Sequence, residues 1–100
     1  MINNPEEEQA VKKLVEQIVR LDIQADEYSE REYYGESISC HDKSNALEDD
    51  LETYYGATLV FQHDELVHVW RDSSIYAVFN FFEWEWLTEQ QIQELPEARP

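Results

Sequence analysis

Residues 57–86 read ATLVFQHDELVHVWRDSSIYAVFNFFEWEW, and this stretch decides the fold class. Two short apolar runs, 57–61 and 66–70, flank the polar loop QHDE, a pattern typical of a β-hairpin. A second polar turn, RDSS, precedes a third strand that starts at Ile75. Sequential strands joined by short turns predict an antiparallel meander of three strands, with a fourth strand as an alternative.

The third strand is predicted to continue to Trp86, because its side chains alternate in character. On this prediction one face carries Phe82, Trp84 and Trp86, while the opposite face carries Glu83 and Glu85. An aromatic face of this kind either packs against helices or forms a partner-binding patch, since Trp and Tyr are enriched at interface hot spots.

Helix signals occupy the two ends of the chain. Asn4 and Pro5 are predicted to start a first helix, because Asn caps helices and Pro suits the first helical position. Apolar residues then recur at the three- and four-residue spacing of one buried stripe: Val11, Leu14, Val15, Ile18 and Leu21. Thr88 and Gln91 predict a capping box for a short final helix, which Pro96 is expected to stop.

The segment between these signals is less regular. Residues 22–36 are acidic and weakly periodic, and Gly35 is predicted to end whichever helix they form. Residues 37–43 are predicted to be a connection, followed by a second clear helix over residues 44–55. Gly56 then suits the left-handed residue that commonly closes a helix.

Together these elements predict a small single acidic α+β domain over residues 1–100, with N-terminal helices packed on the meander and a short C-terminal helix. A chain of 100 residues that is 42% hydrophobic is too apolar for a disordered acidic tail. Cys40 is the only cysteine, the first residues do not resemble a signal peptide, and no apolar run approaches the ~20 residues that span a bilayer. A cytoplasmic location is therefore expected.

The charge balance narrows the choice of partner. The chain has 23 Asp and Glu against 7 Lys and Arg, a formal net charge of −16. We therefore expect neither direct nucleic-acid binding nor adhesion to an anionic membrane. Duplex DNA carries one charge per ~1.7 Å of its axis, and −16 over the roughly 30 Å diameter of such a domain is a similar density.

Signals for chemistry are weak, and we expect no enzyme, no metal site and no cofactor. Cys40 and His41 are adjacent, which is not the ligand spacing of a zinc site. His63 and His68 flank the predicted hairpin loop without a supporting carboxylate pattern. The two glycines of the chain do not form a glycine-rich phosphate loop.

The acidic residues are the stronger candidates. Glu48 and Glu52 lie one helical turn apart, a like-charge pair that costs ~0.2–0.5 kcal/mol, and residues 44–55 contain no Lys or Arg to offset it. The candidate partner-binding residues form two groups: Glu48, Asp49, Asp50 and Glu52 in the second helix, and Asp26, Glu27, Glu30 and Glu32 before it.

The leading hypothesis is a non-catalytic inhibitor or regulator that binds a basic, nucleic-acid-binding protein by mimicking DNA, as in a host-defence or nuclease system. The alternative is a protein–protein adaptor or homodimer that uses Phe82, Trp84 and Trp86 as anchors. In that case the acidity serves only solubility or halophilic adaptation.

Overall fold

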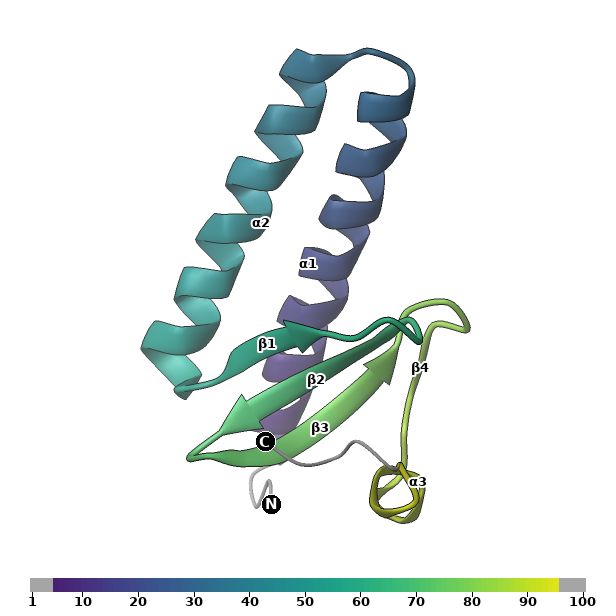
Figure 1. Cartoon of the computed structure of the whole chain (residues 1–100). Coiled ribbons are helices and arrows are strands. Elements are labelled where there is room, and N and C mark those ends of the chain that lie inside the picture. Colours follow the sequence, from purple (N-terminus) through teal and green to yellow (C-terminus); the bar gives the residue numbers. More distant parts are fainter. Residues whose placement is uncertain (1–4, 96–100) are drawn as a thin grey trace. The chain divides into compact units, whose positions relative to one another are not determined.

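The computed structural model describes residues 5–95, which form two compact parts on either side of the Tyr55–Gly56 bond (Figure 1). The first part is a helical hairpin of α1 (Pro5–Glu30) and α2 (Tyr34–Tyr55). The second part holds four strands and a short helix: β1 (Thr58–Phe61), β2 (Leu66–Arg71), β3 (Ser74–Asn80), β4 (Glu85–Trp86) and α3 (Glu89–Gln93). The predicted α+β class is confirmed, and the meander has four strands.

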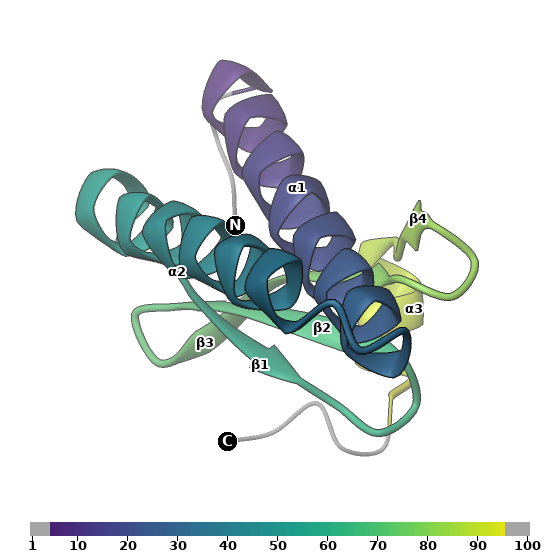
Figure 2. The same cartoon turned by 90° about the horizontal axis from the view of Figure 1, so that it is seen from above.

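Helix α1 begins at Pro5, as predicted, whereas its proposed cap Asn4 lies outside the described residues. The predicted stripe is buried at its centre, where Val11, Val15 and Ile18 are at most 1% exposed. Figure 2 shows α1 and α2 side by side, joined by a short turn. The hairpin core therefore follows from the apolar periodicity of α1.

The prediction of a connection over residues 37–43 is wrong, because α2 already begins at Tyr34. Gly35 accordingly lies in the first turn of α2 and does not end a helix. The buried face of this half of α2 is made of small residues, Ser37, Cys40 and Ser44. Ser37 Oγ donates a hydrogen bond of 2.9 Å to the carbonyl oxygen of Ala25 in α1. Because the buried face of this half consists of small residues, it has no apolar periodicity, and the sequence of this half resembles that of a loop.

The turn between the two helices is closed by backbone hydrogen bonds. Tyr33 N donates to Tyr28 O at 2.8 Å and Glu32 N donates to Ser29 O at 3.0 Å. Glu32 has φ 64°, the left-handed conformation that this type of helix end requires. Gly56, with φ 65°, takes the same conformation directly after α2, as predicted.

The sheet has the strand order β1-β2-β3-β4, and every neighbouring pair is antiparallel. Gln62 N donates to Leu66 O at 2.8 Å across the first loop, so the predicted hairpin is confirmed. Asp72 and Ser73 have φ values of 53° and 65°, as a two-residue turn between twisted strands requires.

The prediction that the third strand continues to Trp86 is wrong, because β3 ends at Asn80. The Asn80 side-chain oxygen accepts hydrogen bonds from Phe82 N at 3.1 Å and Glu83 N at 3.2 Å, which turns the chain back. Trp84 takes φ 58° within this turn, and β4 then pairs with β3. Phe82, Trp84 and Trp86 therefore do not alternate along one strand.

Helix α3 shows both hydrogen bonds of the predicted capping box. Gln91 N donates to Thr88 Oγ1 at 3.2 Å, and Thr88 N donates to Gln91 Oε1 at 2.8 Å. The helix ends at Gln93, and the predicted stop signal Pro96 lies outside the described residues.

Candidate functional site

The helical hairpin carries most of the acidity. Residues 5–55 contain 15 Asp and Glu against 5 Lys and Arg, a net charge of −10, whereas residues 56–95 contain 7 acidic residues against 1 basic residue. Both predicted acidic groups belong to the hairpin part. The hairpin is therefore the more acidic of the two parts, and it carries both predicted groups.

Three of the four acidic residues predicted in α2 share one side of the helix. Successive residues are rotated by about 100°, so Glu48, Asp49 and Glu52 fall within one sector. Asp50 is turned toward the opposite side and does not join them. Asp49 and Glu52 are exposed, while Glu48 is half-buried. The group of four predicted from the sequence is thus a group of three in the helix.

Helix α1 adds a carboxylate to this group. Burial raises the pKa of Glu48 above its usual 4.5, and the neighbouring carboxylates of Asp22 and Asp49 raise it further. Asp22 also lies 3.9 Å from His41, measured from Oδ1 to Nδ1. Sequence reasoning did not select Asp22, although its place four residues after the buried Ile18 indicates that it faces α2. We call Asp22, Glu48, Asp49 and Glu52 the acidic flank.

The raised pKa of Glu48 makes a pH-dependent prediction. A carboxyl group whose pKa is higher in the folded chain destabilises the fold when it ionises, so the cost is present at neutral pH and disappears as pH falls through the raised pKa toward 4.5. We expect Glu48→Gln to be more stable than the parent chain at pH 7, by less than about 1 kcal/mol because the group is half-exposed.

This difference should shrink as the pH falls to 4.5 and below, and urea unfolding followed by circular dichroism at several pH values measures it. Asp49→Asn, which removes an exposed charge from the same turn, serves as the control. A Glu48→Gln advantage that stays constant with pH would contradict the prediction.

The second predicted group lies at the other end of the hairpin. Asp26, Glu27 and Glu30 are exposed in the last two turns of α1, and Glu32 is exposed in the turn that follows. Negative charge at a helix C-terminus opposes the helix dipole, and α1 has no basic residue in its last turn. Helix stability therefore does not account for these carboxylates.

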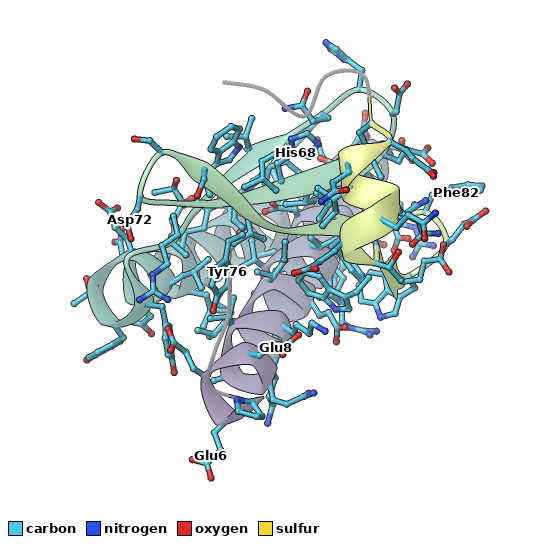
Figure 3. All side chains as sticks on the ribbon, turned by 90° about the horizontal axis from the view of Figure 1, so that it is seen from below. Glu6, Glu8, His68, Asp72, Tyr76 and Phe82 are labelled. Carbon is cyan, nitrogen blue, oxygen red and sulfur yellow. The ribbon has the colours of Figure 1, made fainter. Side chains whose placement is uncertain are left out.

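The aromatic residues of the sheet part differ from one another in exposure. Phe82 is 74% exposed in the turn after β3, where Figure 3 shows it projecting outward. Trp84 and Trp86 are half-buried, with ring centroids 5.1 Å and 4.9 Å from that of Phe79. The two tryptophans thus pack on the core residue Phe79, and only Phe82 presents most of its surface.

Within residues 5–95, no group of three or more His, Cys, Asp and Glu side chains is arranged to hold a metal ion. Cys40 is a buried free thiol. Over the same residues, no helix combines the length and apolar character needed to cross a membrane. In comparisons with known proteins, the chain matches no family model, no curated protein and no solved structure.

Proposed function

We propose that the chain is a non-catalytic inhibitor or regulator that binds a basic protein surface through the acidic flank. The observation that carries this proposal is the environment of Glu48, which is half-buried beside Asp22 and Asp49 with a raised pKa. Gathering like charges in this way opposes folding, so a stabilising role does not explain it. The cationic side chains of a basic partner would offset this repulsion, because each of them attracts the clustered carboxylates.

The charge spacing supports a partner that normally holds nucleic acid. At ~1.5 Å per residue, the 26 residues of α1 and the 22 residues of α2 make a hairpin ~33–39 Å long. Its net charge of −10 corresponds to about one charge per 3–4 Å, close to the ~3.4 Å spacing of phosphates along one DNA strand. Carboxylates at this density suit a groove that otherwise neutralises a phosphate backbone.

Such binding depends on long-range attraction. Complementary charge accelerates encounter, and the attraction between exposed groups weakens beyond ~8 Å at physiological ionic strength. Affinity should therefore fall steeply with salt. A cytoplasmic location belongs to the same proposal, because it is where the chain would meet nucleic-acid-binding proteins.

Affinity capture from a cell lysate at low salt tests the proposal. The immobilised chain should retain nucleic-acid-binding proteins, and duplex DNA at constant ionic strength should release them, because phosphates and carboxylates compete for one groove. An uncharged polymer of equal mass is the control eluent. Retention that resists both salt and DNA would contradict mimicry.

That contrary result would favour the alternative, an adaptor or homodimer, for which the exposed Phe82 is the remaining anchor among the three predicted aromatic residues. Binding through an apolar anchor of this kind is expected to resist salt, because it depends on removing apolar surface from water.

A further inference from the structure

Large side chains are exposed at the turn between α1 and α2. Tyr33 is 55% exposed, Tyr34 is 58% exposed and Ile38 is 60% exposed, all within six residues. Tyr34 and Ile38 lie one helical turn apart and therefore share a side of α2. Clustered apolar exposure of this kind marks interaction surfaces more often than chance, whereas single exposed residues do not. We call these three residues the aromatic turn, which lies at the top of Figure 1.

The aromatic turn is held in place by the hairpin itself. Tyr33 N donates to Tyr28 O at 2.8 Å, and Ser37 N donates to Tyr33 O at 3.0 Å. The rings of Tyr28 and Tyr33 meet edge to face, with centroids 6.5 Å apart and planes at 69°. A surface that is ordered before binding loses little conformational entropy in the complex, and tyrosine itself has few rotatable bonds.

The charges around the aromatic turn indicate which kind of partner can bind there. Glu30, Glu32 and Glu36 flank it and are exposed, against Arg31 alone. A second copy of the chain would bring the same carboxylates and a further net charge of −16, which repels self-association. The complementary occupant is therefore a cationic protein segment that also offers a flat surface to a tyrosine ring.

We infer that the aromatic turn binds arginine side chains of the basic partner. A guanidinium group stacks on the face of a tyrosine ring and at the same time pairs with a carboxylate through two parallel hydrogen bonds. The lysine ammonium is compact and strongly hydrated, and it does neither as well. The inference rests on the proposed function and adds a preference to it: the acidic flank attracts any cation, whereas the aromatic turn selects arginine.

Two synthetic peptides of equal charge, octa-arginine and octa-lysine, test the inference when titrated into the full chain by isothermal calorimetry near 0.15 M ionic strength. The parent chain should bind octa-arginine about tenfold more tightly than octa-lysine. The double substitution Tyr33→Ala/Tyr34→Ala should bring the ratio close to one and leave octa-lysine binding unchanged.

Two matched variants separate stacking from folding. Tyr33→Phe/Tyr34→Phe keeps both ring faces and should keep the ratio. Tyr54→Ala removes a tyrosine that is 73% exposed near the other end of α2, and it should also keep the ratio. Because all three tyrosines are exposed, each variant is expected to retain the circular dichroism of the parent.

The contrary outcomes are distinguishable. Equal affinity of the parent chain for the two peptides, or a preference that survives Tyr33→Ala/Tyr34→Ala, would overturn the inference and leave the proposed function standing. Binding of neither peptide would overturn both.

Discussion

Phe79→Ala is expected to lower the free energy of unfolding of the sheet part by about 3–5 kcal/mol, the range for removing a buried aromatic ring. Phe79 is 0% exposed in β3, and the rings of Trp84 and Trp86 pack on it at 5.1 Å and 4.9 Å. The substitution leaves a cavity and also removes the surface on which both indole rings rest. Trp84 then loses the contact that compensates its left-handed φ of 58°.

Urea unfolding followed by tryptophan fluorescence measures this effect, because Trp70, Trp84 and Trp86 all lie in the sheet part. The midpoint should fall strongly, and the emission of the folded variant should shift to longer wavelength as the indoles meet water. Phe82→Ala is the matched control, since Phe82 is 74% exposed in the same turn and should cost within about 0.5 kcal/mol. Equal urea midpoints for Phe79→Ala and Phe82→Ala would show that packing on Phe79 does not stabilise the turn that contains Trp84.

Glu48→Lys/Glu52→Lys is expected to weaken binding of octa-lysine by about tenfold, or ~1.4 kcal/mol, without unfolding the hairpin. Two like-charged residues of the acidic flank become cations, so the partner's cations meet repulsion where they met attraction. Inside the hairpin the same change replaces repulsion at Asp22 and Asp49 by attraction, and stability should not fall.

A control of equal net charge decides whether location matters. Glu83→Lys/Glu85→Lys changes the net charge from −16 to −12, as the first variant does, but alters exposed residues of the sheet part. Calorimetric titration at two ionic strengths should show a larger loss and a reduced salt dependence for the hairpin variant. Equal losses would mean that octa-lysine senses only the overall charge and that the acidic flank is not an interface.

The helices and hairpins were predictable where local chemistry decides them. Thr88 and Gln91 form their capping box through side chains three residues apart, and the RDSS turn needs only residues that tolerate positive φ. One error fell where a distant contact decides the structure. Ser37 looks like a loop residue until Ala25, on the other helix, accepts its hydrogen bond. The other error is local: the Asn80 side chain accepts hydrogen bonds from Phe82 N and Glu83 N, two and three residues on, and this turn overrides the β propensity of the aromatic residues.

The candidate site also has features that the sequence predicts and one that only the structure shows. The sequence determined that carboxylates dominate the hairpin and that Glu48 and Glu52 share a helix face, because charge and helical rotation are properties of the chain itself. It did not determine that Asp22, on the other helix, joins Glu48.

By itself, then, the sequence determined an acidic α+β protein with one amphipathic helix, a meander and a capped final helix, since periodicity, turn chemistry and composition act over a few residues. The tertiary structure alone decided the full length of α2, through the Ser37–Ala25 hydrogen bond, and the place of Asp22 beside Glu48. Each of these depends on residues far apart in sequence, whose interaction free energy exists only after the backbone has brought them together.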